Sequence, residues 1–207
     1  MENINIEKER ARFEEILRST GRRGIGDVLD LLAGNGFYEA PASVARHLNC
    51  RGGLLKHSLN VYDEAMMLRK GQCSLQKEME ELLPDDSVAI AALLHDVCKS
   101  DIYVPAMRSR KTVDGSWEKY RTWETDYSAF PAGHGEKSVF MLLQAGLELT
   151  DAEILAIRWH MAPWDTALQS TESMKCLELS RRLYPLVTLV SMADGLAACL
   201  LEETDGR

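Results

Sequence analysis

The sequence predicts an all-α fold in a single domain, and three observations support this prediction. Apolar residues recur at the three- and four-residue spacing of amphipathic helices along most of the 207 residues. Glycine, proline and capping residues stand between these segments. The chain has no repeat, low-complexity tract or linker. Residues 1–207 are therefore interpreted as one domain, with N-terminal helices at 1–40 and a helical core at 41–203.

The first half of the chain is predicted to be helical throughout. The expected segments are residues 6–19, 25–32, a short helix with a loop at 41–53, a long helix at 54–70, a surface helix at 74–83 and an apolar helix at 87–97. Phe13 and Leu17 lie on the apolar stripe of the first segment. Gly71 is expected to stop the long helix. Pro84 and two aspartates favour the start of the apolar one.

The second half contains the one expected departure from helix. Residues 102–125 are rich in Tyr, Trp, Thr and Val around the turn signal Val113-Asp-Gly-Ser116, which predicts a small β-hairpin or a long ordered loop. Helices resume at 135–146. Thr150 and Glu153 form a capping box that opens a helix ending near His160. A loop at 159–169 and two helices within 174–203 complete the prediction.

Charge and cysteine usage restrict the class of protein. The net charge of -8 argues against an extended nucleic-acid surface, which needs clustered excess Lys and Arg. It is compatible with a small anionic substrate in a locally basic pocket. Five cysteines without a CxxC pair, and a charged start without an apolar signal segment, favour a cytoplasmic protein. Pro185 and Asp194 within the apolar stretch 183–201 favour a buried core helix over a membrane span.

Histidine and aspartate residues form a pattern typical of a metal site. His95 and Asp96 are adjacent at the polar end of an apolar helix, where burial costs several kcal/mol unless the groups are paired or bind a metal. The dipeptide alone is weak evidence, because a helix-terminal His followed by an exposed Asp also explains it. His57 and Asp194, however, stand on two further helices. Nitrogen and carboxylate ligands together suit Fe, Mn, Co, Ni or Zn better than Ca or Mg alone.

These segments resemble a known family. Gly52-Gly-Leu-Leu-Lys-His57, Leu93-Leu-His-Asp-Val-Cys-Lys99 and Ala193-Asp194 are similar to the H…HD…D signature of the HD-domain superfamily of metal-dependent phosphohydrolases. The first block most resembles bacterial members with a Gly-Gly-Leu-Leu-x-His segment. The similarity covers about residues 41–201.

The resemblance implies a ligand set. In an HD-type helical bundle, His57, His95, Asp96 and Asp194 would bind one divalent metal. Members with two metals add two histidines between the HD pair and the last Asp, and this chain has His134 and His160 there. Asp96 would then bridge the ions. The alternative is a single ion, with His134 in a loop and His160 capping a helix. His47 matches no ligand position and is interpreted as a wall or surface residue.

Lys99 and Asp96 are the predicted catalytic residues. On a continuing helix Lys99 shares a side with the HD pair, where its charge can neutralise a phosphoryl group. The alternative is an exposed lysine that complements the helix end. Predicted phosphate contacts lie on the hairpin: Arg108, Arg110, Lys111 and Arg121. A solvated hairpin that pairs these charges with its own glutamates is an equal alternative. Trp164 and Asp165 are expected either to line the pocket or to fill core, and Asp165 could orient a ligand His.

The leading functional hypothesis is metal-dependent hydrolysis of a phosphate mono- or diester, in a nucleotide or a related small metabolite. One or two ions of Mn, Fe, Co, Ni or Zn are expected, and Mg is also compatible. A di-iron oxygenase with the same ligands is the first alternative, because the metal decides the chemistry. An exoribonuclease and a non-catalytic nucleotide sensor are further alternatives. The apolar helix faces are compatible with a homodimer.

Overall fold

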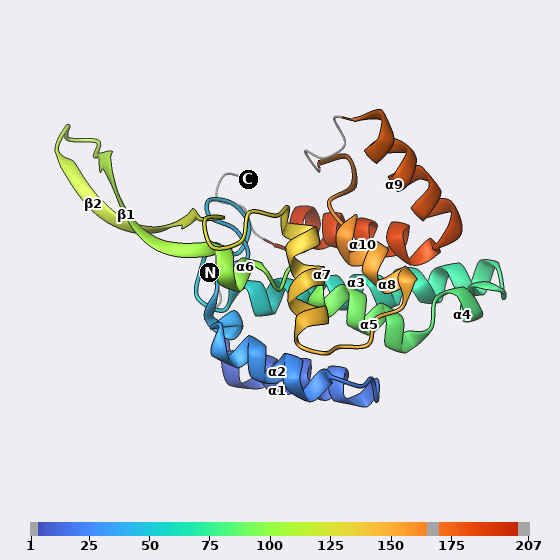
Figure 1. The fold of residues 1–207 in the computed structure, drawn as a ribbon. Helices are drawn as coiled ribbons and strands as arrows, with labels where there is room; N and C mark the ends of the chain where they lie inside the picture. Colours follow the sequence, from blue (N-terminus) through green and yellow to red (C-terminus); the bar gives the residue numbers. More distant parts are fainter. Residues whose placement is uncertain (1–3, 165–169, 203–207) are drawn as a thin grey trace.

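Helices α3 (Gly53–Leu75), α5 (Asp85–Leu94), α8 (Asp151–Arg158) and α10 (Pro185–Leu196) pack against one another at the centre of the molecule (Figure 1). The computed structural model describes residues 4–164 and 170–202. Every residue from Ser87 to Leu94 of α5 is buried. This explains the unbroken apolar run of α5 and makes it the axis of the core.

Further helices surround this centre. They are α1 (Ile6–Ser19), α2 (Ile25–Gly34), α4 (Met79–Leu82), α6 (Lys99–Ile102), α7 (His134–Gln144) and α9 (Thr171–Leu183), with 3-10 turns η1 (Phe37–Glu39) and η2 (Ala162–Trp164) and the π-helical turn η4 (Ala197–Leu201). Helices α1 and α2 form a layer on one side, and α9 lies on the opposite side of the centre (Figure 1). Phe13 and Leu17 of α1 are fully buried, as their stripe predicts.

The helical prediction is confirmed for most segments, and the local signals act as expected. The Thr150 side chain accepts a hydrogen bond from the Glu153 backbone N–H, and the Glu153 side chain accepts one from the Thr150 backbone N–H, so the capping box starts α8. Pro185 occupies the first turn of α10, where its missing N–H costs nothing. The apolar stretch therefore begins a new helix and does not continue α9, which ends at Leu183. Among the described residues no single helix is long and apolar enough to cross a membrane, and the bent pair α9 with α10–η4 turns by 104° at its break.

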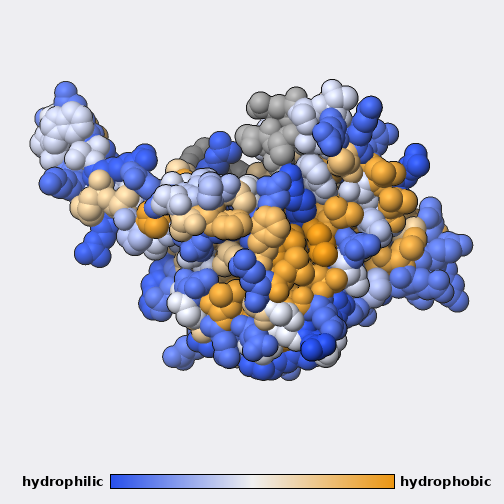
Figure 2. Space-filling model, viewed as in Figure 1, coloured by the Kyte–Doolittle hydropathy of each residue, from blue (hydrophilic) through white to orange (hydrophobic). Residues whose placement is uncertain are grey.

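The hairpin prediction is confirmed. Strands β1 (Tyr103–Lys111) and β2 (Trp117–Thr125) pair antiparallel, in a register from Tyr103 opposite Thr125 to Lys111 opposite Trp117. The ribbon extends away from the helices, so its base at α6 is its only region near the core in Figure 1. Its surface is mainly hydrophilic, whereas apolar side chains gather over α7 and α9 (Figure 2).

Three predicted helix boundaries are wrong. Residues 41–52 contain no helix, because the backbone turns sharply at Leu48, which has a positive φ of 44°. Gly71 does not stop α3, which continues to Leu75; one glycine costs a helix only about 1 kcal/mol. The surface helix expected at 74–83 is reduced to the short α4, which buries no side chain and so gains little from packing.

The predicted helix at 87–97 also ends early. Helix α5 stops at Leu94, and residues 95–98 form turns before α6 begins at Lys99. His95 and Asp96 therefore lie in these turns, and both side chains are buried.

Candidate metal centre

Six predicted ligands converge in one cluster, and each comes from an element of the central bundle or its edge. His57 lies on α3, His95 and Asp96 follow α5, His134 begins α7, His160 follows α8, and Asp194 lies on α10. Overlapping sets of these side chains place one ligand atom each within 4.8 Å of one another, close enough to hold a metal ion. The sequence-predicted ligand set is therefore brought together in space.

One half of the cluster surrounds Oδ2 of Asp96. Nε2 of His95 lies 3.1 Å from this oxygen and Nε2 of His57 lies 3.7 Å from it. The two Nε2 atoms are 3.3 Å apart. Asp194 completes this half, with Oδ1 3.2 Å from Nε2 of His57.

The other half surrounds Oδ1 of Asp96. Nε2 of His160 lies 3.4 Å and Nε2 of His134 lies 3.9 Å from this oxygen, and the two nitrogens are 3.2 Å apart. Oδ1 is buried and has no hydrogen-bond partner within the described part of the chain. Such an atom costs free energy unless a cation or donor satisfies it. Asp96 thus directs its two oxygens at two different histidine pairs.

Second hydrogen bonds fix which histidine nitrogen faces the cluster. Nδ1 of His95 donates to the carbonyl oxygen of Ala92 at 2.8 Å, and Nδ1 of His160 donates to that of Ile157 at 2.7 Å. Because a carbonyl can only accept, Nδ1 carries a proton in each ring, and Nε2 is the nitrogen that faces the cluster. Metal-binding histidines are held in this manner.

His57 has the corresponding contact with a carboxylate that the sequence analysis missed. Nδ1 of His57 lies 2.9 and 3.1 Å from the two oxygens of Glu202, which also accepts a hydrogen bond from Asn60. The π-helical turn η4 ends at Glu202 and brings it back to α3. His47 lies beside this pair, with Nε2 3.8 Å from Glu202 and its ring 5.0 Å from that of His57. His47 is therefore a wall of the site and not a surface residue.

The titration behaviour of the cluster shows strong mutual interaction. Burial lowers the pKa of His57, but Asp194 and Glu202 outweigh it and raise that pKa to about 9. Burial raises the pKa of Asp96, yet Lys99, His95 and His160 hold it well below its usual range. These shifts follow from carboxylates and imidazoles in contact inside a core. A bound cation must replace the proton on His57, so binding would release protons.

Lys99 lies within the site, as predicted, although α5 does not continue to it. Its Nζ is 2.5 Å from Oδ2 of Asp96, and its side chain is only 12% exposed. Burial lowers the pKa of Lys99, but Asp96 and Tyr103 raise it above its ordinary value. The lysine is thus the buried counter-charge of the carboxylate, and the alternative of an exposed lysine at a helix end is wrong.

Two glycines bring the ligand-bearing elements together. A Cβ on Gly53 would lie 2.0 Å from the carbonyl oxygen of Leu48, so only glycine lets α3 start against the preceding loop. A Cβ on Gly135 would lie 2.4 Å from the carbonyl oxygen of Arg158. That close approach of α7 to the end of α8 places His134 beside His160.

The predicted phosphate contacts on the hairpin lie outside the cluster. Arg108 pairs with Glu124 at 3.1 Å and Arg110 pairs with Glu118 at 2.5 Å, all on the exposed ribbon. These are the pairs of the solvated-hairpin alternative. Lys111 and Arg121 also lie on the strands, beyond the base where Tyr103 approaches Lys99. Asp165, a predicted orienting residue, lies outside the described residues.

Comparisons with known proteins place the chain in no group. No protein-family model, no curated protein and no solved structure matches it. The helical fold with its hairpin and the buried His/Asp cluster are compatible with an HD domain, and the assignment of function depends on the site itself.

Proposed function

We propose that the protein is a metal-dependent hydrolase of phosphate mono- or diesters, of the HD-domain kind, acting on a nucleotide or a related small metabolite. One observation carries the proposal. Asp96 directs Oδ2 at His57 and His95 and Oδ1 at His134 and His160. A carboxylate between two sets of imidazole nitrogens suits two adjacent divalent transition metals.

Bound divalent ions supply an acidified water and a positive charge for a phosphoryl oxygen. The residues of this chain have separate tasks. The carbonyl oxygens of Ala92 and Ile157 keep the Nε2 atoms of His95 and His160 available as ligands. Lys99 places a permanent positive charge beside Asp96, where negative charge develops during phosphoryl transfer. The buried walls exclude bulk water and strengthen these interactions.

The hairpin cations stay a prediction for phosphate contact. Arg108 and Arg110 are already paired with glutamates. Among the four hairpin cations, Lys111 and Arg121 are therefore the candidates for contact with a substrate. An exoribonuclease is less favoured, because the chain carries a net charge of -8.

The test uses protein stripped of metal and reloaded with Mn, Fe, Co, Ni, Zn or Mg. Phosphate or nucleoside monophosphate release is measured over a panel of mono- and diesters, including nucleotides. We expect turnover with at least one ion and its loss in His95→Ala and Asp96→Asn, with Glu178→Gln, an exposed residue of α9, as the matched control. Equal activity in wild type and His95→Ala would refute the proposal. Iron-dependent oxygen uptake without ester cleavage would replace it with an oxygenase.

A further inference from the structure

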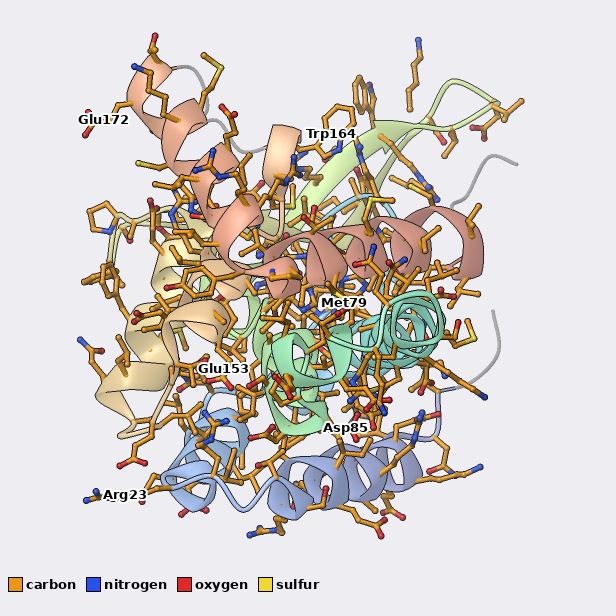
Figure 3. The ribbon with its side chains drawn as sticks, turned by 90° about the vertical axis from the view of Figure 1, so that its right-hand side faces the viewer. Arg23, Met79, Asp85, Glu153, Trp164 and Glu172 are labelled. Atoms are coloured by element: carbon orange, nitrogen blue, oxygen red, sulfur yellow. The ribbon has the colours of Figure 1, made fainter. Side chains whose placement is uncertain are left out.

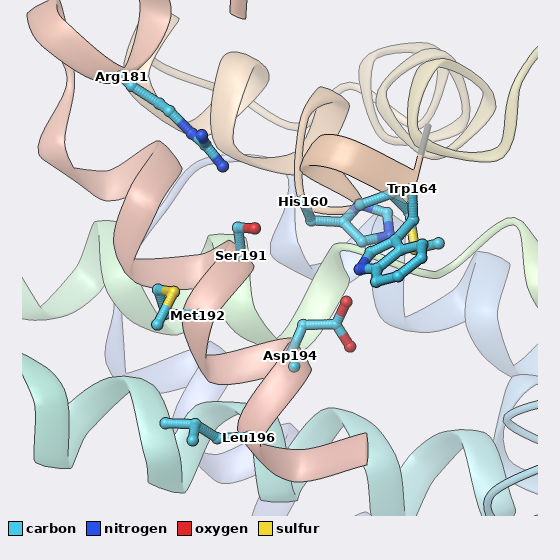
Figure 4. A pocket seen from close by; sticks show the side chains of 9 residues that line it. His160, Trp164, Arg181, Ser191, Met192, Asp194 and Leu196 are labelled. Carbon is cyan, nitrogen blue, oxygen red and sulfur yellow. The ribbon is translucent and has the colours of Figure 1, made fainter. Parts of the chain in front are cut away.

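A cavity of about 310 Å³ opens beside the metal ligands, between η2, α9 and α10. Its walls include His160, Trp164, Arg181, Ser191, Met192 and Asp194 (Figure 4). The volume is at the small end of ligand pockets, so it suits one small molecule rather than a polymer. His160 and Asp194 belong to the ligand set, and the cavity therefore leads directly to the site.

The exposed fractions of the cluster side chains agree with access of a small molecule from the cavity. The side chains of His57, His95, Asp96 and His160 are at most 2% exposed, whereas Asp194 is 15% exposed. His134, at 24%, forms the other open edge of the cluster. Only the edge at Asp194 adjoins the cavity walls named above, so a molecule seated in the cavity can reach the site past this carboxylate.

Arg181 provides a positive charge inside the cavity. Figure 4 shows its side chain extending from α9 toward the space between Ser191 and His160. Within residues 4–164 and 170–202, no carboxylate lies at ion-pair distance from its guanidinium, unlike Arg108 and Arg110 of the hairpin. A guanidinium without a carboxylate partner among these residues is suited to bind a phosphate through two parallel hydrogen bonds.

Trp164 provides an aromatic surface on another wall. Its side chain is 81% exposed although it lies four residues after the buried ligand His160. The 3-10 turn that carries it begins at Ala162, a non-glycine residue with a positive φ of 42°, so the local backbone adopts a costly conformation there. Figure 3 shows Trp164 on the side of α10 opposite to α1 and α2. An exposed indole at the entrance of a cavity can stack on a nucleobase.

From these contacts we infer that the cavity is the binding subsite for a single nucleotide, in which Arg181 binds a phosphate oxygen and Trp164 stacks on the base. The inference rests on the proposed function for its substrate class and deepens it. It assigns the phosphate contact to α9 and not to the hairpin. Because every base has a π-face, Trp164 selects nucleotides over sugar phosphates with little preference among bases.

The test measures binding without turnover. Metal-free protein is titrated by calorimetry with AMP, ribose 5-phosphate and adenosine, and Trp fluorescence is recorded. We expect AMP to bind about tenfold more tightly than ribose 5-phosphate, the size of one base–aromatic stack. Trp164→Leu removes that difference. Arg181→Gln weakens AMP and ribose 5-phosphate about tenfold and leaves adenosine unchanged, while Arg181→Lys restores part of the loss.

Arg182→Gln is the matched control, because Arg182 is the exposed arginine next to Arg181 on α9 and is not among the residues that line the cavity. Its AMP affinity should equal that of wild type. Arg121→Gln tests the hairpin as the alternative phosphate contact, and a larger loss of AMP affinity than in Arg181→Gln would overturn the inference. Equal affinities for AMP and ribose 5-phosphate would also overturn it. The two proposals fail separately. If the protein binds nucleotides but cleaves no ester with any metal, the proposed hydrolase activity is wrong and the nucleotide subsite stands. If it cleaves esters and KM is unchanged in both Arg181→Gln and Trp164→Leu, the hydrolase activity stands and the subsite is wrong.

Discussion

Glu202 holds His57 from behind, with Oε1 2.9 Å from Nδ1 of the imidazole, and both side chains are buried. Nε2 of the same ring faces His95, Asp96 and Asp194. A carboxylate on the far nitrogen fixes the ring orientation and raises its basicity as a ligand. The last described residue of the chain thus orients the ring of His57, although 145 positions separate them.

Replacing Glu202 should weaken metal binding without removing a ligand. Glu202→Gln keeps the size and an acceptor oxygen but loses the negative charge, so we expect the affinity for the tightest ion to fall about 10- to 100-fold. Competition with a chelator of known affinity measures this. Glu178→Gln changes the same charge on the surface of α9 and should leave affinity as it is. Equal affinities in all three proteins would show that Glu202 serves only to pack the chain end.

The protein should bind two ions. Asp96 faces a histidine pair with each oxygen, so wild-type protein reloaded after chelation is expected to contain two ions per chain by elemental analysis. His134→Ala should contain one, because His57, His95 and Asp96 still offer ligand atoms close together at the first position. A wild-type value of one ion would assign His134 and His160 to a structural role.

Lys99 should matter for the reaction more than for the metal. Lys99→Met removes the charge beside Asp96 while filling similar space, so the carboxylate remains available to cations. We expect unchanged ion stoichiometry and a fall in kcat of about 10²- to 10³-fold, the size typical of a lost transition-state contact, with a smaller change in KM. If the variant loses its ions in parallel with its activity, Lys99 only maintains the site.

The ion pair between Arg22 and Glu153 should contribute strongly to stability. Glu153 is fully buried, and Arg22 binds both of its oxygens at 2.7 and 2.9 Å. Arg22→Met leaves a buried carboxylate without its partner, so the free energy of unfolding should fall by about 3–5 kcal/mol. Urea unfolding measures the loss. Arg23→Ala breaks the exposed pair with Glu148 and should cost at most about 1 kcal/mol; similar losses in both variants would contradict the prediction.

The buried His/Asp cluster could be predicted from the sequence because the chemistry of its side chains restricts where they can stand. A chain with five histidines offers few ways to build a site, and the HD pair after the apolar run 88–94 marks buried polar groups. Glu202 could not be predicted, because a carboxylate after a final apolar helix looks like any solvated helix end. Only the π-helical turn before it, which depends on tertiary packing, directs it to His57.

The difference between local signals and tertiary packing also explains which parts of the fold were predicted correctly and which were not. Turn and capping signals are local, so the hairpin around Gly115 and the capping box at Thr150 were predictable. The end of α5 at Leu94 was not, because nothing in the sequence opposes another turn of helix; burial of His95 and Asp96 in the core overrides the propensity. Trp164 was expected to line the pocket or to fill core, and it lies on the wall of the cavity, whereas Arg181 belongs to a segment that carries no motif and only the cavity relates it to the cluster.

Gly135 should determine whether a second ion binds, because it sets the distance between α7 and the end of α8. Any Cβ there would meet the carbonyl oxygen of Arg158 at 2.4 Å and that of Ile157 at 3.1 Å, and neither backbone atom can move like a side chain. Gly135→Ala must therefore shift α7 away from the end of α8, which separates His134 from His160. We expect one ion per chain instead of two, with the affinity of the remaining ion near the wild-type value.

The matched control for Gly135 is Gly26→Ala. No atom outside the local helix backbone lies within 4 Å of a Cβ at Gly26 on α2, so this change should leave both ions bound and stabilise the helix by up to about 1 kcal/mol. If Gly135→Ala retains two ions at wild-type affinity, the contact between α7 and α8 does not position the second pair of ligands. If it unfolds the chain, the glycine has a role in stability that calorimetry separates from metal content. If Gly135→Ala instead loses one ion, the close approach of the two backbones is what positions the second half of the site. His134 lies 3.9 Å from Asp96 while α7 lies against the end of α8.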